Sequence, residues 1–190
     1  AVCGLRPPPH LVRMRLLDTD LRSVTGSLSD ITAPIGELAH RPIKPRCAFI
    51  VENVQTALAF GELKGTVLIM GLGYAVEVLG ELSWLTGIPC IYWGDLDTHG
   101  FAILSRVRGY LPQTVSCLMD EHTLLEHREL WGNESQPHSA LELPNLTPAE
   151  QDVYQGLKSQ RWGINVRLEQ ERIYWPTAWN KIQQTVLTII

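Results

Sequence analysis

The sequence predicts an α/β fold in which a parallel sheet of about four strands is flanked by helices. Four short apolar runs lack period-two alternation, which is typical of strands covered on both faces; they span residues 47–51, 66–70, 88–93 and 114–118. Segments of helical composition separate or follow these runs, and they cover residues 53–60, 74–82, 99–110 and 121–129. Asn53 and Asp120 are the expected N-caps of two of them. Short β-α connections favour a doubly wound sheet, whose ligands bind beyond the carboxyl ends of the strands.

Two extensions flank this core. Residues 1–46 are predicted to form an N-terminal arm, with a half-exposed edge strand at 12–17 because apolar and polar residues alternate there. Residues 131–190 are predicted to form a helical extension that completes the same domain. Within it, Thr147–Glu150 has the spacing of a capping box and predicts a helix to about residue 158, and residues 177–190 predict another. The expected division is therefore 1–46, 47–130 and 131–190.

Composition favours a soluble, cytoplasmic protein with one substantial core. The chain has 190 residues, of which 45% are hydrophobic, and no apolar run is long enough to span a bilayer. Pro7, Pro8 and Pro9 stand where a signal peptide would need an apolar stretch. The four cysteines show no C-x-x-C pairing, so we expect neither zinc nor disulfides.

The charge of the chain argues against a free-standing nucleic-acid binder. The formal net charge is -4, whereas phosphate neutralisation requires clustered Lys and Arg. Local basic patches must therefore carry any contact with DNA. The candidates are Arg41, Lys44, Arg46, Arg106, Arg108, Arg161, Arg167 and Arg172, each of which is otherwise an ordinary solvated charge.

Three acidic residues directly follow two of the predicted strands. Glu52 follows the run 47–51, and Asp95 and Asp97 follow the run 88–93, so all three should gather at one rim of the sheet. Carboxylates gathered in this way repel one another, and an oxygen-only ligand set with open positions is typical of Mg²⁺ or Mn²⁺. Gly94 and Gly100 give this turn room for close approach of backbone or phosphate. Each acid alone is more simply a solvated turn residue or a helix cap, but the combination favours a metal site.

These motifs resemble a known family. Phe49-Ile-Val-Glu52-Asn53 and the segment Tyr92–Gly100, which contains Gly-Asp-Leu-Asp, look like the Toprim domain of topoisomerases, primases and related nucleases. The second motif is similar to that of topoisomerase VI A subunits, and the match is closer still to JetD, the nuclease subunit of Wadjet plasmid-defence systems. The resemblance covers most of the chain and runs through Leu16-Leu17-Asp18, Trp84-Leu85, Ser116–Asp120, Trp131 and Arg167–Glu171.

The resemblance implies a Toprim-like (Rossmann-like) core and a metal-dependent DNA endonuclease. It also implies double-stranded DNA and SMC-like Wadjet subunits as partners, with a homodimer as a further expectation. No winged-helix domain with an attacking tyrosine precedes residue 47, and all five tyrosines lie within the Toprim-like or later segments. We therefore expect hydrolysis rather than transesterification, carried out by the C-terminal part of a longer protein.

Roles follow for individual residues. Glu52, Asp95 and Asp97 are expected to hold one or two Mg²⁺ or Mn²⁺ ions, with general base as an alternative role for Glu52. Glu169 and Glu171 are candidates for a second ion, since alternate residues of an extended segment face the same way; a solvated charge run explains them equally well. Arg167 and His99 are candidate phosphate contacts, although we favour a helix cap for His99. His122 and His127 are five residues apart and do not align as a ligand pair.

Two rival functions remain open. Gly71-Leu72-Gly73 after the run 66–70 resembles the start of a dinucleotide-binding fingerprint, but Val76 stands where the third glycine belongs. Bound NAD would favour this function, and metal-dependent nicking would exclude it. The chain could also be a non-catalytic docking module that retains a degenerate Toprim fold.

Overall fold

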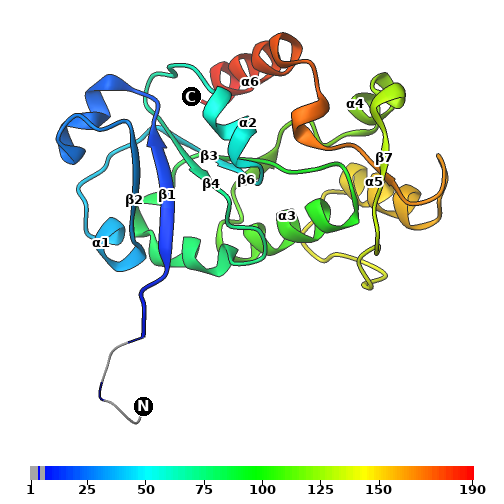
Figure 1. Ribbon diagram of the computed structural model, residues 1–190, viewed down its shortest axis with the longest axis horizontal. Helices are drawn as coiled ribbons and strands as arrows, with labels where there is room; N and C mark the ends of the chain where they lie inside the picture. Colours follow the sequence, from blue (N-terminus) through cyan, green and yellow to red (C-terminus); the bar gives the residue numbers. More distant parts are fainter. Residues whose placement is uncertain (1–3, 5–6) are drawn as a thin grey trace.

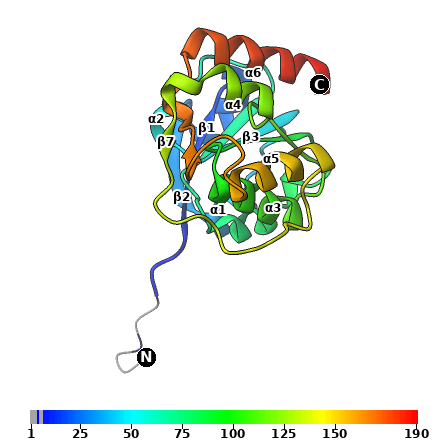
Figure 2. The ribbon, with the colours of Figure 1, turned by 90° about the vertical axis from the view of Figure 1, so that its right-hand side faces the viewer.

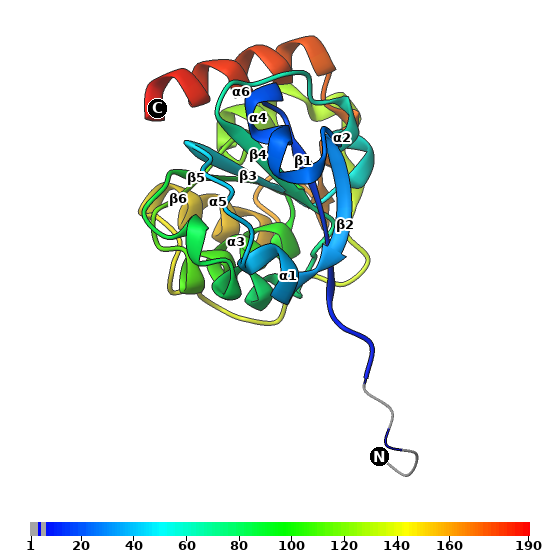
Figure 3. The same cartoon turned by 90° about the vertical axis from the view of Figure 1, so that its left-hand side faces the viewer.

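A six-stranded sheet organises the computed structural model, which describes residue 4 and residues 7–190. The strand order is β2-β1-β4-β3-β5-β6, which can be followed across the sheet in Figure 3. The strands are β1 (Leu11–Leu16), β2 (Asp30–Pro34), β3 (Cys47–Val51), β4 (Thr66–Met70), β5 (Cys90–Trp93) and β6 (Thr114–Ser116). Strands β4, β3, β5 and β6 are parallel, and β1 is antiparallel to both β4 and β2. The predicted α/β class and the four parallel strands are confirmed.

The parallel strands form where the sequence is continuously apolar. Every residue of β3, β4 and β5 is buried, so none of these strands shows alternation. The other two predicted runs are longer than the observed strands. Strand β5 begins only after Pro89, which has no N–H to contribute to a ladder, and Leu118 has a φ of 57°, which ends the extended backbone after β6.

The edge position expected for residues 12–17 is wrong, because β2 lies outside β1. Strand β1 does show alternating burial, but its outer neighbour was not predicted from the short, partly exposed sequence Asp-Ile-Thr-Ala-Pro. Arg13 of β1 and Asp30 of β2 form a salt bridge of 2.7 Å across this pair. Pro34 is tolerated at the end of β2 because the strand lies at the edge of the sheet.

Helices cover both faces of the sheet. Figure 1 shows α2 and α6 on one side of the sheet and α3 on the other. The helices are α1 (Ile35–Ala39), α2 (Val54–Ala59), α3 (Thr98–Tyr110), α4 (Glu121–Glu126), α5 (Pro148–Lys158) and α6 (Trp175–Ile189). The predicted N-caps Asn53 and Asp120 are confirmed, since each side chain accepts a backbone N–H of its helix. The capping box of Thr147 and Glu150 at the start of α5 is confirmed as well.

The helix predicted at 74–82 is wrong. The segment forms a 3₁₀ turn, η2 (Val76–Glu81), followed by a second one, η3 (Ser83–Leu85). Its start has no side-chain cap, and the β-branched Val76 and Val78 together with Gly80 lower its helix propensity. The turn Gly71–Gly73 after β4 is therefore followed by no α-helix, so the helix N-terminus that would bind a pyrophosphate in a dinucleotide fold is missing here.

The C-terminal extension returns to the carboxyl ends of the parallel strands. Strands β7 (Gly132–Asn133) and β8 (Val166–Arg167) pair antiparallel, and Figure 2 shows β7 beside the orange segment that contains β8. Leu96 and Leu168 then form an isolated bridge with N–H···O distances of 2.9 and 3.1 Å. Short 3₁₀ turns complete the described chain: η1 (Thr19–Thr25), η4 (Arg128–Leu130) and η5 (Gln170–Arg172). Of the helices that the structure describes, none has the length and apolar character required to cross a membrane.

Candidate metal centre at the ends of strands β3 and β5

Strands β3 and β5 are neighbours, and this brings the predicted acids together. Val51 pairs with Trp93, so Glu52 lies beside the turn that carries Asp95. The Asp95 N–H donates to Glu52 Oε2 at 3.2 Å. Asp97 lies two residues further on, at the start of α3. We call Glu52, Asp95 and Asp97 the carboxylate rim.

Two glycines allow the turn to fold this tightly. A Cβ at Gly94 would lie 2.5 Å from the Tyr92 hydroxyl and 2.6 Å from Glu52 Oε2. A Cβ at Gly100 would collide with the carbonyl oxygen of Asp95. The close approach expected at these glycines is thus made by the chain's own carboxylate and backbone.

The N-terminus of α3 is surrounded by acidic side chains. Asp97 Oδ1 accepts the N–H of Gly100 at 2.7 Å and is the N-cap of the helix. Glu134, only 5% exposed, accepts the Thr98 hydroxyl at 2.7 Å and the His99 N–H at 3.2 Å. Both carboxylates gain from the positive end of the helix. Glu134 was missed by sequence reasoning, since a lone glutamate in a polar loop carries no signal.

Negative charge is only partly compensated at the carboxylate rim. Burial, together with the charges of Asp95 and Asp97, raises the pKa of Glu52 to about 7. Burial also raises the pKa of Asp97 to about 6, although the hydrogen bond from Gly100 opposes this shift. Near neutral pH, part of this site is therefore poised to gain a proton or a cation.

Arg167 supplies the positive charge that the rim has. Its Nη2 lies 2.5 Å from Asp95 Oδ2, and its Nε lies 3.1 Å from Asp97 Oδ2. Burial alone would lower the pKa of Arg167, but the hydrogen bond and charge of Asp95 and the charge of Asp97 raise it above its usual value. Arg167, which was predicted to contact phosphate, thus contacts two acids of the rim directly.

Gln170 ties the extension to both strand ends, and sequence reasoning missed it. The side chain is 1% exposed and donates to the Trp93 carbonyl at 2.5 Å, while its Oε1 accepts the N–H of Asn53 at 2.9 Å. Its backbone N–H donates to Asp95 Oδ1 at 3.0 Å. A fully buried glutamine next to two charged residues is visible in the sequence only as part of a polar run.

The remaining predicted site residues lie around the rim with different partners. A 3₁₀ turn begins directly after Glu169 and contains Glu171, so the segment is not extended throughout and the alignment argument for the two glutamates is wrong. Glu169 pairs with Arg172 at 2.6 Å and with Arg167 at 3.5 Å, whereas Glu171 is exposed. A role for either glutamate as a metal ligand stays a prediction.

His99 is not the cap that we favoured, because Asp97 caps α3. One ring nitrogen of His99 meets the Tyr74 hydroxyl, and the other lies 2.8 Å from the Gln136 carbonyl. Tyr74 also stacks on His138 with ring centroids 6.5 Å apart. The cluster lies at the first turn of α3, which Asp97 caps, and burial together with the charges of Asp97 and Glu52 raises the pKa of Tyr74 to about 12.

The described residues contain no group of three or more His, Cys, Asp or Glu side chains already arranged around a metal position. The rim nevertheless has the donor chemistry that Mg²⁺ or Mn²⁺ prefers, namely carboxylate oxygens with uncompensated charge. The guanidinium of Arg167 stands between Asp95 and Asp97 in this arrangement. The residues present fit a divalent ion in chemistry, provided that Arg167 yields its contacts.

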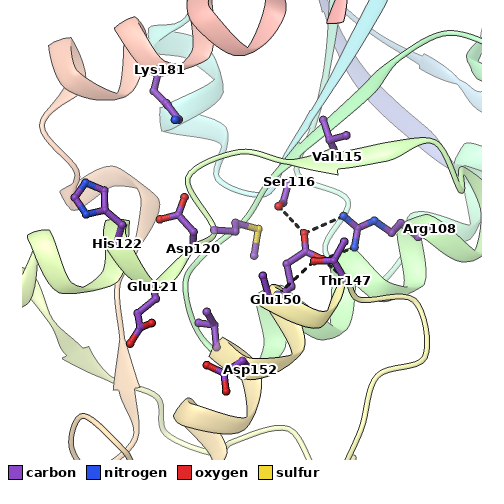
Figure 4. A pocket seen from close by; sticks show the side chains of 13 residues that line it. Arg108, Val115, Ser116, Asp120, Glu121, His122, Thr147, Glu150, Asp152 and Lys181 are labelled. Carbon is purple, nitrogen blue, oxygen red and sulfur yellow. Dashed lines mark hydrogen bonds and ion pairs between the residues drawn. The ribbon is translucent and has the colours of Figure 1, made fainter. Parts of the chain in front are cut away.

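A cavity of about 760 Å³ lies between β6 and helices α4, α5 and α6, and none of the three rim acids lines it (Figure 4). Its wall contains the salt bridge between Arg108 and Glu150, with Nη1 to Oε2 at 2.5 Å. Ser116 donates to Glu150 at 2.6 Å, and the N–H of Thr147 donates to it at 2.8 Å. Because Glu150 is fully satisfied by these partners, its polarity serves the fold.

Most of the candidate phosphate-binding arginines are paired with acids. Arg106 contacts Glu77 at 3.2 Å, and Arg161 contacts Asp152 at 2.8 Å. Arg108 is held by Glu150 as described above. These pairs leave little uncompensated positive charge on the arginines predicted to contact DNA.

The fold and the rim define a class: a mixed α/β domain with acidic side chains at the carboxyl ends of adjacent parallel strands. The chain matches the family described as "Wadjet protein JetD, C-terminal" over residues 4–182. It therefore belongs to the JetD C-terminal family, as the resemblance implied. A search of curated proteins found no match.

Proposed function

We propose that this chain is the catalytic, Toprim-like domain of a metal-dependent DNA endonuclease in a Wadjet plasmid-defence system. The observation that carries the proposal is the meeting of Glu52, Asp95 and Asp97 at the ends of two adjacent parallel strands. Membership of the JetD family supports the setting, in which double-stranded DNA and SMC-like subunits are the partners. A cytoplasmic location and a homodimer with two cutting sites belong to the same proposal.

The carboxylate rim is the proposed binding site for Mg²⁺ or Mn²⁺. When bound, such an ion supplies positive charge that polarises the scissile phosphate and activates water. Glu52 has a pKa of about 7 and is suited to take a proton from the attacking water at neutral pH. Glu169 and Glu171 are proposed as outer ligands for a second ion.

Arg167 and His99 are proposed to orient the phosphate. Both side chains are partly exposed, and each lies next to an acid of the rim or to the helix that Asp97 caps. A guanidinium binds phosphate through two parallel hydrogen bonds, and an imidazole can donate one. The two nitrogens of the His99 ring now meet the Tyr74 hydroxyl and the Gln136 carbonyl, so His99 must exchange one of these partners to donate to a phosphate.

The test is plasmid cleavage by the chain together with its Wadjet partners, with and without Mn²⁺. Glu52→Gln and Asp95→Asn/Asp97→Asn variants should remove cleavage, because each loses carboxylate charge at the rim. Asp152→Asn is the matched control, since Asp152 is exposed and its one ionic partner among the described residues is Arg161. Cleavage that survives in the rim variants contradicts the proposal.

A docking module is the second candidate, and one observation favours it. Arg167 already contacts both Asp95 and Asp97 and offsets part of their charge, as a salt bridge does in a site that has lost its metal. Mn²⁺ binding separates the two functions: a docking module has no reason to bind the ion at the rim, whereas the nuclease must do so.

A further inference from the structure

The aspartates of the rim have few oxygens left for a new ligand. Asp95 Oδ1 accepts the N–H of Gln170 at 3.0 Å, and Asp97 Oδ1 accepts the N–H of Gly100 at 2.7 Å. The other oxygen of each aspartate faces Arg167. The Oδ2 atoms are the ones that accept no backbone N–H, so a cation that enters between Asp95 and Asp97 competes with the guanidinium for them.

Arg167 is held at this place by the backbone. It is the last residue of β8, which pairs with β7, and the next residue, Leu168, bridges to Leu96 between the two aspartates. The position of its Cα is thus fixed by the fold. The side chain is less constrained than the backbone, because it is 35% exposed and takes no part in the strand hydrogen bonds.

The guanidinium makes an incomplete set of contacts. Its Nε is buried and lies 3.1 Å from Asp97 Oδ2, yet it has no hydrogen bond of acceptable geometry. Glu169 Oε1 lies 3.5 Å from Nη1 and offers a carboxylate outside the rim. Arg167 can therefore leave one aspartate without losing all of its acidic partners.

We propose that Arg167 is an internal counter-cation that competes with the divalent ion for Asp95 and Asp97, and that it turns to the phosphate of DNA once the ion is bound. This inference rests on the proposed function, because it requires a metal at the rim. It adds an exchange of cations. Without the ion, Arg167 offsets part of the negative charge of Asp95 and Asp97, and once the ion is bound the released guanidinium becomes available to the substrate. The same residue thereby opposes metal binding and favours DNA binding.

The exchange predicts effects of opposite sign for one substitution. Arg167→Gln removes the competing charge, so Mn²⁺ should bind more tightly, by on the order of tenfold at low salt. Cleavage of plasmid DNA should fall in the same variant, because the phosphate loses its guanidinium. Arg167→Lys keeps the charge but loses the planar fork, so its Mn²⁺ affinity should lie between those of the wild type and Arg167→Gln.

Calorimetric titration with Mn²⁺ near pH 8 tests the inference, with thermal unfolding to show that each variant is folded. Arg161→Gln is the matched control: Arg161 pairs with Asp152 at the surface, and the structure shows no contact between it and Asp95, Asp97 or Glu169. Tighter binding in Arg167→Gln alone supports the exchange. Binding that is unchanged or weaker in folded Arg167→Gln, while the wild type binds, overturns it and leaves the proposed nuclease intact. If neither protein binds Mn²⁺, the metal site fails and the exchange fails with it.

Discussion

Two groups of carboxylates in this domain show opposite electrostatics. At the carboxylate rim, burial raises the pKa of both Glu52 and Asp97, and the neighbouring hydrogen-bond donors and the charge of Arg167 near Asp97 offset this only in part. Beside the cavity of Figure 4, burial acts on Glu150 as well, but Arg108, Ser116 and Thr147 lower its pKa below the usual value. The fold thus gives Glu150 a full set of hydrogen-bond and ionic partners and leaves part of the negative charge of Glu52 and Asp97 uncompensated. The difference assigns a structural role to Glu150 and supports the proposed function of the rim.

The largest effect should follow from removing the aspartates of the rim. Asp95→Asn/Asp97→Asn should reduce plasmid cleavage by roughly a thousandfold, because the developing phosphate charge loses its electrostatic support. Glu150→Gln serves as the control at the other site and should cleave as the wild type does. Equal losses in both variants would show that cleavage tracks general stability and not the rim.

The next effect concerns the buried salt bridge between Glu150 and Arg108, which we call the paired site. Glu150→Ala should destabilise the domain by about 3 kcal/mol, because it leaves the buried Arg108 without its partner. Urea unfolding measures this loss, and Mn²⁺ titration of the folded variant should show unchanged affinity. A change in Mn²⁺ affinity with little change in stability would reverse the roles that we give to the two sites.

The two sites should respond to pH with opposite sign. Glu52 keeps its proton in the folded state up to about pH 7, above its ordinary pKa of 4.5, so its ionisation destabilises the fold as pH rises through this window. The pKa of Glu150 is lowered from 4.5, so its contribution is present above that value and is lost as pH falls through the folded pKa. The free energy of unfolding, measured by urea at each pH, tests this. Glu52→Gln should lose the fall in stability between about pH 4.5 and pH 7, and Glu150→Gln should lose the fall in stability at low pH.

Metal affinity should also depend on pH through Glu52. Below about pH 7 the ion must displace a proton, so the affinity for Mn²⁺ should fall by about tenfold per pH unit at most. Calorimetry in buffers of different ionisation enthalpy detects the released proton. Affinity that is constant from pH 8 to pH 6 would remove Glu52 from the ligand set.

The smallest effect is expected at an exposed pair. Asp152→Ala breaks the contact with Arg161, but this pair lies at the surface and is screened by solvent. We expect unchanged Mn²⁺ affinity, unchanged cleavage and no measurable loss of stability by urea unfolding. A large effect there would mean that charge anywhere on the domain matters, which would blur the contrast between the rim and the paired site.

The sequence was sufficient to predict the strands that carry the rim. The run 47–51 matches β3 and the run 88–93 contains β5, because fully buried parallel strands are continuously apolar. The helix expected at 74–82 does not form because local helix propensity is weak, and the 3₁₀ turn η2 packs there against α3 and α1. Strand β2 was missed because a short, partly exposed edge leaves almost no pattern.

The partners of the rim were harder to predict, since they come from distant parts of the chain. Arg167 and Gln170 lie more than seventy residues after Asp95, and the bridge between Leu96 and Leu168 that brings them close has no local signature. Glu134 reaches the start of α3 from a loop in the same way. The domain boundaries at residues 46 and 130 stay a prediction.

Crystals grown with Mn²⁺ and measured near the manganese absorption edge test the central claim most directly. If the rim binds the ion, an anomalous peak should lie between Glu52, Asp95 and Asp97. The guanidinium of Arg167 should then be displaced from at least one aspartate. A bound manganese ion elsewhere, with Arg167 still on both aspartates, would contradict the assignment of this rim as the metal centre.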